Sequence, residues 1–513
     1  MYLVPPQLDV NFVIAIMKKL RFPTAQTILI LIAAMVTLLT WIVPAGEFDH
    51  LSFQPDTHTF QRTNSEGSES LPGTQETLEQ LKIKVPLEKF TSGDIYKPIS
   101  IPGTYKRLDS KPQGFAAFVQ SPIKGIIEAS DVIFLVLIIG GLIGIMNATG
   151  AFDAGISWLA KALHGREFLL IILVTTLIAA GGTTFGLAEE TMAFFPILIP
   201  VFLAAKYDEM VGLACIFLGS SIGTMCSTIN PFSVIIASDA AGINWTTGLP
   251  GRITMLVLCL VITMVYILRY ARRVKKDPKA SLIYEDKKKS AGMHFKELDH
   301  SVALTLRLKL ILAIFSLSFL VMIIGVSALG WWFVEMTATF LVGAVLIGFV
   351  GRIRESEFLE AFSKGAAELL SVTFIIGIAR GVSVLMDDGL ISDTMLYYAS
   401  SFTEGMNKGL FTNAMLFIYA GLSFFIPSSS GMAVLTMPIM SPLADTVHIG
   451  REIIVNCYQY GMGLFYLINP TGLILASLAI IKVGFDKWLK FVMPLFIILI
   501  LVTMVFLSVS VYV

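Results

Sequence analysis

The sequence predicts an all-α membrane protein that crosses the bilayer many times and contains an inverted internal repeat. Three observations lead to this prediction. Hydrophobic residues make up 55% of the 513 residues, charged residues only 14%, and the mean hydropathy is +0.77, so many apolar runs reach the ~20 residues that a spanning helix needs. Two apolar stretches, 179–200 and 422–442, share a tip of Gly, Ser, Thr or Glu and a Pro-x3-Pro pair. The two halves of the chain also contain segments that resemble each other.

The two polar-tipped stretches are the features around which we interpret the rest of the chain. Each of their arms has about half of the ~20 residues of a full span, so we expect re-entrant hairpins whose tips stop near the middle of the membrane. Non-helical backbone at that depth occurs only where it is buried in protein or lines a cavity. Short segments interrupted by Gly or Pro at matching places in two halves are typical of the substrate site of a transporter.

The first part of the chain is predicted to contain one span and a long polar loop. Lys18, Lys19 and Arg21 precede an apolar run at 24–44, and this positive charge places the N-terminus in the cytoplasm. No cleavable signal pattern precedes the run, so we expect the span in the mature protein. The loop at 45–114 is then expected outside, either as a tolerated insertion or as a small extracytoplasmic cap.

The rest of the first half is predicted to contain two spans, a hairpin and a broken helix. Spans are expected at 130–147 and 251–270, with a hairpin at 167–205 between them. The apolar segment 210–242 is interrupted by CSTINPFS, where Pro231 removes a backbone donor and frees carbonyls of the preceding turn. A strongly basic loop follows the second of these spans, which fixes that loop in the cytoplasm.

The second half is predicted to follow a similar plan. In order, we expect spans at 308–328, 333–350 and 368–387, a hairpin at 409–446, a helix at 452–482 broken at LINPTG, and a last span at 488–511. The total is about nine spans plus two hairpins, with the C-terminus outside. The chain then divides into an N-terminal cytoplasmic segment with the first span (1–44), an extracytoplasmic loop (45–114), a first repeat (115–270), a basic cytoplasmic linker (271–307) and a second repeat (308–513).

The internal repeat can be followed residue by residue. Residues 128–153 align without gaps on residues 368–393, which places Glu128 on Glu368. The Asn-Pro pair that begins at Asn230 in the first broken helix corresponds to the pair that begins at Asn469 in the second. Corresponding elements cross the membrane in opposite directions in the predicted topology, so we expect an inverted repeat.

The four interruptions are predicted to form the substrate site. A helix broken inside the membrane exposes N–H groups that attract carboxylates and C=O groups that attract cations, as an ion-coupled carrier of a small anion or zwitterion requires. The candidate substrate ligands at these interruptions are Thr183, Thr184, Gly186, Asn230, Ser428, Ser429, Ser430, Gly431, Asn469 and Thr471. A coupling Na+ is expected near Asn230, Ser227, Asn469 and Ser429, because hard cations prefer oxygen ligands. In the alternative interpretation, these small polar residues only satisfy backbone groups that the helix breaks set free.

Three charged residues within apolar segments are further candidates, because charges at membrane depth are costly and mark ion or substrate pathways. One of Glu189 and Glu190 is expected to face the cavity, where it binds a cationic group of the substrate or carries a proton. The structural alternative places both in ion pairs. Arg380 either holds a substrate carboxylate or pairs with Asp131 or Asp387.

Other functional classes receive little support from the sequence. The net charge is zero and the basic residues lie in predicted loops, so nothing indicates a nucleic-acid partner. The four cysteines lie in apolar segments without the spacing of metal ligands or of a disulfide framework. All six histidines fall in predicted loops or interfacial stretches, so no nucleophile and base of an enzyme can be paired. We expect no catalytic site, and no cofactor other than Na+ or H+ as a coupling ion.

Four stretches of the sequence carry a resemblance to a known family. They are GGTTFGLAEETMAFFPILIP, GSSIGTMCSTINPFSVIIASDAAGI, FIPSSSGMAVLTMPIMSPLAD and YGMGLFYLINPTGLILA. They are similar to the C4-dicarboxylate anaerobic carrier-like family, in particular its branch of basic amino-acid antiporters, within the ion transporter superfamily. The resemblance runs from the first span to the C-terminus. It implies a secondary carrier of the bacterial inner membrane with a scaffold part and a transport part, often homodimeric, that works by an elevator-like motion.

The resemblance also bears on the substrate. Sodium-coupled dicarboxylate carriers of the superfamily have a Ser-Asn-Thr signature at a hairpin tip, which Ser428, Ser429 and Ser430 match only loosely. The adjacent Glu189 and Glu190 fit a positively charged substrate better than a dianion. We therefore expect an antiporter of basic amino acids of the arginine or ornithine type. The alternatives are a Na+- or H+-coupled carrier of a C4-dicarboxylate or other small carboxylate, and a channel, which would show no trans-stimulated uptake.

Overall fold

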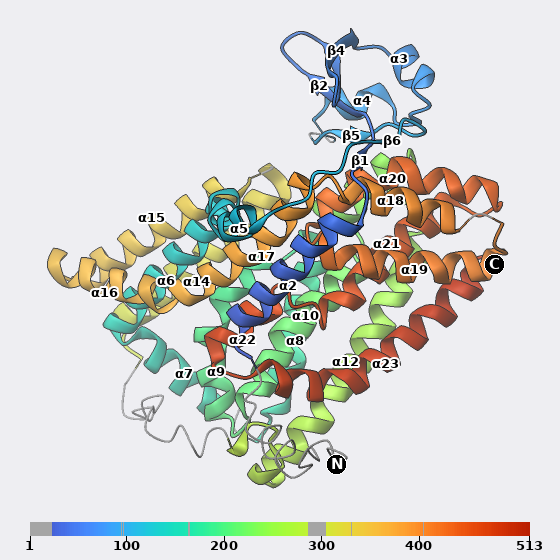
Figure 1. Ribbon diagram of the computed structural model, residues 1–513. Coiled ribbons are helices and arrows are strands. Elements are labelled where there is room, and N and C mark those ends of the chain that lie inside the picture. Colours follow the sequence, from blue (N-terminus) through green and yellow to red (C-terminus); the bar gives the residue numbers. More distant parts are fainter. Residues whose placement is uncertain are drawn as a thin grey trace, which may run out of the picture.

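The computed structural model describes residues 23–512 apart from Asp94, Tyr96, 163–164, 286–303, 330 and 404. In this part, the chain forms a broad block of long helices with a small β-containing unit on one side (Figure 1). We call this unit the cap and define it as residues 46–107. The N-terminal basic residues and the lysines at 287–289, on which the predicted topology partly rests, lie outside the described residues.

Eight described helices are long and apolar enough to cross a membrane. They are α2 (Ala25–Ile42), α6 (Ser130–Thr149), α12 (Leu249–Lys276), α14 (Leu306–Leu329), α15 (Phe333–Gly351), α17 (Leu370–Asp388), α19 (Lys408–Phe425) and α23 (Phe485–Ser510). All but α19 lie where the sequence predicts unbroken spans, and α19 is the first arm of the second hairpin. The prediction of an all-α membrane part with many spans is confirmed.

The second half of the chain repeats the order of elements of the first half. The first half contains α5 (Phe115–Glu128), α6, α7 (Ala151–Ala162), α8 (Phe168–Thr184), η1 (Glu189–Ala193), α9 (Phe194–Ala204), α10 (Glu209–Met225), η2 (Pro231–Ile235), α11 (Ile236–Ala240) and α12. The second half contains α16 (Glu355–Glu368), α17, α18 (Ser392–Phe402), α19, α20 (Ser429–Thr446), α21 (Arg451–Tyr466), α22 (Ile474–Ile481) and α23. Helices α5 and α16 end at the aligned residues Glu128 and Glu368, so these helix ends follow the sequence alignment.

Helices of one half pack on helices of the other. Helix α5 of the first half packs against α17 of the second, and the corresponding helix α16 of the second half packs against α6 of the first. Glycines permit both contacts, because a side chain at Gly125 would meet the backbone of Gly377 and Gly381, and one at Gly365 would meet the backbone of Gly140. Small residues of this kind let membrane helices approach closely. Gly125 and Gly365 occupy the same position in α5 and α16, so both halves have a glycine at the point where two helices pack closely.

Both predicted hairpins are present as pairs of helices, but their arms are longer than expected. Helix α8 has 17 residues, and α19 and α20 have 18 residues each, which corresponds to about 26 Å at 1.5 Å per residue. Only α9, with 11 residues, is short. The expectation of half-length arms is therefore wrong for α8, α19 and α20 and holds for α9. The apolar pattern extends beyond the stretches 179–200 and 422–442, and α20 continues through Pro438 and Pro442.

The interruptions predicted at the two Asn-Pro pairs separate α10 from α11 and α21 from α22. In the first, α10 ends at Met225, and Pro231 begins the short π-helix η2. In the second, α21 ends at Tyr466, and α22 begins only at Ile474. Proline lacks an N–H group and has a fixed φ, so it suits the start of a helix but not its interior.

The segment predicted as the loop 45–114 contains the folded cap. Strands β2 (His50–Gln54), β3 (Thr59–Asn64), β4 (Gly67–Pro72) and β5 (Ile99–Ser100) form an antiparallel sheet in the order β4-β3-β2-β5, and β1 (Gly46–Glu47) pairs with β6 (Lys106–Arg107). Helices α3 (Gln75–Gln80) and α4 (Leu87–Thr91) complete the unit. Its small core contains Leu51, Phe60, Leu78, Phe90 and Ile99. Of the two interpretations of this segment, the structure supports the compact cap; the side of the membrane on which it lies stays a prediction.

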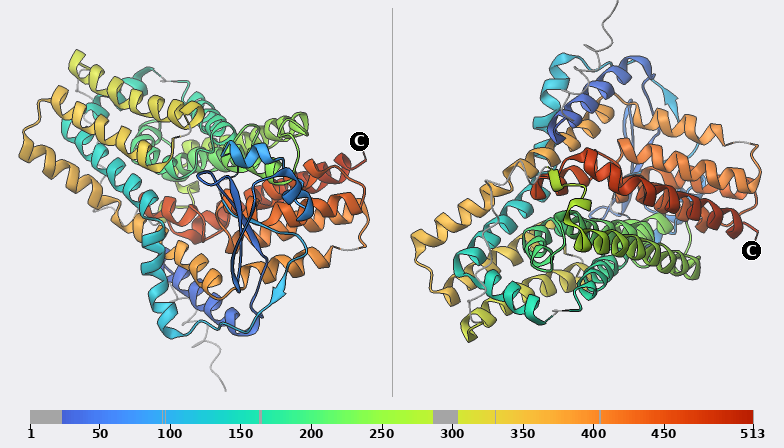
Figure 2. Two further views of the ribbon diagram at one scale, coloured as in Figure 1. Left: turned by 90° about the horizontal axis from the view of Figure 1, so that it is seen from above. Right: turned by 90° about the horizontal axis from the view of Figure 1, so that it is seen from below.

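The membrane helices form two groups when the molecule is viewed from above or below (Figure 2). Helices α6, α14, α15 and α16 form an elongated group on one side, in which α15 packs on both α6 and α14. The hairpins, the broken helices, α12 and α23 fill the other side. The polar interruptions therefore lie in one of the two groups.

Candidate substrate site

Hydrogen bonds join the first hairpin to the first helix break. The carbonyl of Thr183, in the last turn of α8, accepts the N–H of Thr228 (3.1 Å), and the hydroxyl of Thr183 accepts the same N–H (3.0 Å). Asn230 donates through Nδ2 to the carbonyl of Gly182 (3.4 Å). Its Oδ1 accepts the N–H of Phe232 (2.9 Å), so Asn230 also caps η2. The break is thus held against the end of the hairpin arm.

The second hairpin and the second break use the same hydrogen bonds. Asn469 donates through Nδ2 to the carbonyl of Ser423 (3.0 Å), and its Oδ1 accepts the N–H of Thr471 (3.0 Å). Gly182 and Ser423 each lie two residues before the end of their arm. The correspondence between Asn230 and Asn469 therefore extends to their partners, and each asparagine ties a helix break to a hairpin.

Replacing either asparagine by aspartate should destabilise the protein. The substitution keeps the oxygen that accepts the capping N–H, but it replaces the Nδ2 donor by an oxygen that faces the carbonyl of the hairpin arm. A buried polar group without a partner costs roughly 1–3 kcal/mol, so we expect a lower Tm in detergent for Asn230→Asp and for Asn469→Asp. Asn244→Asp is the control, because exposed Asn244 uses only its Oδ1, which accepts from Thr246. Equal losses of Tm in all three variants would contradict the role of the Nδ2 bonds.

The tip of the second hairpin is the N-terminal end of α20. Ser428 caps this helix by accepting the N–H of Gly431 (3.2 Å). The carbonyl of Ser429 accepts the hydroxyl proton of Tyr458 in α21 (2.8 Å), and Oγ of Ser430 accepts from Nζ of the lysine at position 97 in the cap (2.9 Å). The four predicted residues of this tip lie together at a helix N-terminus, where N–H groups and the helix dipole attract a carboxylate.

The tip of the first hairpin places its two glutamates differently. Glu190 is buried, and its Oε2 accepts the N–H of Ala188 (3.1 Å), which is a local structural role. Glu189 is only partly buried, and η1, on which it lies, packs against α6 and α10. Of the two glutamates, Glu189 is therefore the more exposed one.

Helix α21 links the second tip to the first break. The hydroxyl of Tyr466 donates to the carbonyl of Pro427 beside the second tip. Nε2 of Gln459 donates to Oγ of Ser233 in η2 (3.1 Å). The interruptions of both halves thus meet around one face of α21.

Arg380 lies in α17 beside the second tip and pairs with a residue that the sequence analysis did not propose. Its Nε lies 3.0 Å from Oε2 of Glu128 at the end of α5, with side chains 40% and 45% exposed. One turn further along α17, Ser383 donates to the last carbonyl of α19 (3.3 Å). The expected pairing with Asp131 or Asp387 is wrong, because the packing of α17 on α5 brings Arg380 to Glu128.

Two predicted residues of the first tip have local roles. The hydroxyl of Thr184 donates to the carbonyl of Ala180 in its own helix (2.7 Å). Gly186 has a φ of +82°, and a Cβ at this position would lie 2.8 Å from Oδ1 of Asn230. Glycine is therefore needed for the left-handed turn and for the close approach of Asn230.

The oxygens predicted to bind Na+ are engaged in hydrogen bonds within the described residues. Oδ1 of Asn230 and Oδ1 of Asn469 accept N–H groups of the backbone. The hydroxyl of Ser227 donates to the carbonyl of Thr224 (2.6 Å), and the carbonyl of Ser429 accepts from Tyr458. A hydroxyl that donates and a carbonyl-type oxygen that accepts can each still offer a lone pair to a cation, so the Na+ site at these residues stays a prediction.

Four residues of this region were not singled out from the sequence: Lys97, Tyr458, Gln459 and Tyr466. Gln459 alone carried a signal, because an amide in an otherwise apolar helix needs a polar partner. The two tyrosines resemble ordinary aromatic packing residues in sequence. The lysine is separated from Ser430 by 333 positions, so no local pattern connects them.

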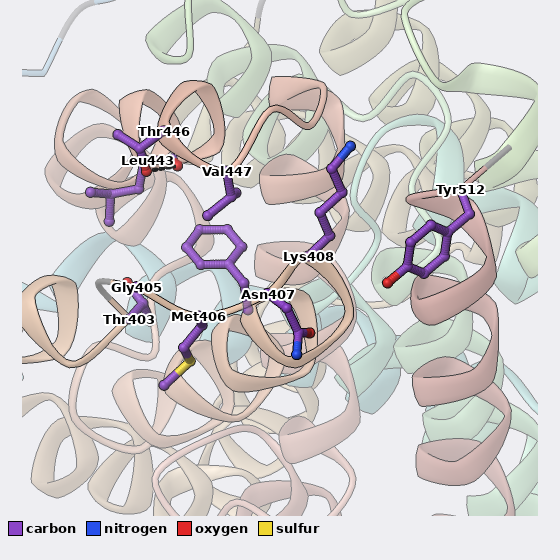
Figure 3. A pocket seen from close by; sticks show the side chains of 10 residues that line it. Thr403, Gly405, Met406, Asn407, Lys408, Leu443, Thr446, Val447 and Tyr512 are labelled. Atoms are coloured by element: carbon purple, nitrogen blue, oxygen red, sulfur yellow. Dashed lines mark hydrogen bonds between the residues drawn. The ribbon is translucent and has the colours of Figure 1, made fainter.

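Surface hollows on the described part of the protein lie away from the tips. One, of about 550 Å³, is lined by Thr403, Met406 and Lys408 around the α18–α19 loop, by Leu443 at the end of α20 and by Tyr512 (Figure 3). Another, of about 540 Å³, lies at the ends of α6, α14 and α15. Neither of these two hollows is lined by a hairpin-tip residue.

Comparison with known proteins identifies the family. A family model described as "DcuC: C4-dicarboxylate anaerobic carrier" matches residues 22–512. The chain belongs to the DcuC family. A Haemophilus influenzae protein described as "Uncharacterized protein" is 42% identical over 497 residues, covering 96% of this chain and 98% of the relative. The Escherichia coli K12 protein named "Putative basic amino acid antiporter YfcC" is 29% identical over 496 residues, covering 92% and 93%.

Two solved transporters align with this DcuC family member over most of its length. The YdaH transporter of Alcanivorax borkumensis is 12% identical with a TM-score of 0.39 and covers 95% of this chain and 98% of its own. MtrF of Neisseria gonorrhoeae, described with a class of antimetabolite efflux pumps, is 14% identical with a TM-score of 0.39 and covers 96% of both chains. The family and the eight apolar helices make this protein an integral membrane protein of a carrier family.

Proposed function

We propose that this DcuC family member is an antiporter of basic amino acids of the arginine and ornithine type. The observation that carries the proposal is the distribution of charge between the two tips. Glu189 and Glu190 lie at the first tip, whereas Lys97 reaches Ser430 at the second. Arg380 lies on α17 and is paired with Glu128. A basic amino acid carries cationic groups and a carboxylate, so each end of the substrate finds opposite charge.

The proposal assigns a role to each tip. The carboxylate of the substrate binds at Ser428–Gly431 and the N-terminal end of α20, where the helix dipole is positive. Glu189 binds a cationic group of the substrate. Glu190 holds the backbone of the first tip through Ala188. Tyr466 holds the backbone beside the second tip through its hydrogen bond to Pro427.

Alternating access is proposed to arise from movement of one helix group relative to the other. The hairpins and broken helices form the transport part, and α5, α6 and α14–α17 form the scaffold. The hydrogen bonds of Asn230 and Asn469 support this division, because they tie each hairpin to its own break. Helices α14 and α15 expose apolar side chains, including Leu320, Leu346 and Phe349, which we propose face lipid and a second copy in a homodimer.

The proposed orientation follows the charge distribution of the sequence. The N-terminus and the basic linker lie in the cytoplasm of a bacterial inner membrane, and the cap and C-terminus lie outside. The two halves are then related as an inverted repeat. Their equal order of elements and reciprocal packing support this proposal.

A carrier of C4-dicarboxylates or other small carboxylates is the second candidate. The description of the family favours it, and Lys97 and Arg380 near the second tip suit a dianion. Coupling to H+ is compatible with the glutamates of the first tip. Coupling to Na+ near Asn230, Ser227, Asn469 and Ser429 belongs to this second candidate, and we propose no Na+-dependent step for the antiporter.

Trans-stimulated uptake into proteoliposomes tests the proposed function. Vesicles loaded with a mixture of amino acids receive radiolabelled arginine or succinate outside, with Na+ present or replaced by K+. We expect internal amino acids to accelerate arginine uptake, and Na+ to have no effect. Uptake of succinate without arginine would favour the second candidate. Arginine flux without trans-stimulation would indicate a channel.

A further inference from the structure

One lysine of the cap, Lys97, reaches the second tip. Lys97 directly precedes the segment that leads into β5, and its Nζ lies 2.9 Å from Oγ of Ser430 in the first turn of α20. Strand β5 also packs near α20. A side chain from outside the membrane helices therefore reaches the helix N-terminus at which we place the substrate carboxylate.

Two further lysines fix the cap on the same group of helices. Nζ of Lys89 lies 3.2 Å from Oδ1 of the buried Asp239 at the end of α11. Nζ of Lys84 lies 2.9 Å from Oδ2 of Asp445 near the end of α20. A Cβ at Gly242 would lie 2.7 Å from the carbonyl of Lys84, so the backbone of the cap touches the turn after α11. These contacts hold the cap over the second tip, so the backbone that carries Lys97 stays close to α20.

Positive charge converges at this tip. Burial, followed by the nearby charge of Arg380, lowers the pKa of Lys97. Arg380 uses its Nε towards Glu128, and a guanidinium has five N–H donors in all. The N-terminal end of α20, capped by Ser428, adds the positive end of a helix dipole. An anionic group of a small ligand would be attracted by Lys97 and by the helix end, whereas the charge of Arg380 is balanced by Glu128.

We propose that Lys97 of the cap is a substrate ligand that binds the carboxylate of the transported molecule, together with Ser430. The cap then forms part of the substrate site, and it makes the protein bind substrates with a carboxylate more tightly than substrates without one. This inference rests on the proposed function for the choice of substrate. It goes beyond it by assigning a specificity-determining residue to a segment outside the repeats.

Uptake of arginine in competition with agmatine, its decarboxylated analogue, tests the assignment. In wild type we expect arginine to bind more tightly than agmatine. For Lys97→Gln we expect the KM for arginine to rise about 10- to 100-fold, as for the loss of a hydrogen bond to a charged group, with the inhibition constant of agmatine unchanged. Lys97→Arg should restore discrimination to within a few fold of wild type.

Lys106→Gln is the matched control, because it removes a cap lysine whose exposed ion pair with Glu66 lies within the cap and does not touch the tip. It should leave the ratio of arginine to agmatine affinity unchanged. Unchanged discrimination in Lys97→Gln, or equal changes in both variants, would overturn the assignment. If wild type carries succinate and not arginine, the proposed substrate fails. The KM for succinate in the same variants then decides the role of Lys97 independently.

Discussion

Replacing Glu189 by Gln is expected to lower kcat/KM for arginine exchange by at least about 100-fold. In the proposed site, Glu189 meets the cationic group of the substrate, and removing one partner of a buried charge pair costs roughly 2–5 kcal/mol. A 100-fold loss corresponds to about 2.7 kcal/mol and lies within this range. Initial rates of trans-stimulated arginine uptake over a range of concentrations measure the effect.

Glu190→Gln provides the matched comparison. Glutamine keeps an oxygen that can accept the N–H of Ala188, so the structural bond of Glu190 survives. We expect a loss of less than about 10-fold, since only a neutral hydrogen bond replaces a charged one. A severe loss at Glu190 with normal exchange at Glu189 would reverse the two roles. Normal exchange in both variants would show that neither glutamate of the first tip binds the substrate.

Gly186→Ala is expected to abolish exchange and to lower the Tm of the protein. A left-handed backbone costs a residue with a side chain about 1–2 kcal/mol, and Gly186 has a φ of +82°. The added Cβ would also lie 2.8 Å from Oδ1 and 3.0 Å from Nδ2 of Asn230. Asn230 must therefore move, which breaks the link between the first hairpin and the first helix break. Exchange assays and thermal unfolding in detergent measure both effects.

Gly421→Ala is the control for this substitution. Gly421 lies in α19, and a Cβ there would meet no atom within 4 Å. Alanine is favoured over glycine in a helix by about 1 kcal/mol, so the Tm should be equal or higher and exchange should be normal. Wild-type stability and exchange in Gly186→Ala would show that the first tip does not need the contact with Asn230.

The membrane class and the unbroken spans could be predicted from sequence composition alone. Helices α2, α6, α14 and α15 begin and end close to the predicted limits. An apolar run of span length has one favourable structure in a bilayer, a helix that satisfies its own backbone groups. The two breaks could also be predicted, because the missing N–H of proline acts on the residues next to it.

The lengths of the hairpin arms and the fold of the cap could not be predicted in this way. A polar tip indicates where a helix ends, but it does not determine how far the arms extend, and α19 and α20 reach 18 residues each. In the cap, His50 and Leu51 of β2 pair with Ser100 and Ile99 of β5. Such strand pairing depends on partners that are far apart in the sequence, and the short strands have little periodicity of their own.

The sequence by itself determined a multi-spanning protein with polar turns between apolar helices and two Asn-Pro breaks, because helix formation, capping and helix breaking depend on neighbouring residues. That the two polar-tipped stretches re-enter the membrane stays a prediction. The tertiary structure decided how these parts combine. It distinguished Glu189 from Glu190, paired Arg380 with Glu128 across 252 positions, and brought Lys97 to the second tip. These contacts depend on which helices pack together, and that is set by the fit of whole surfaces rather than by any local pattern.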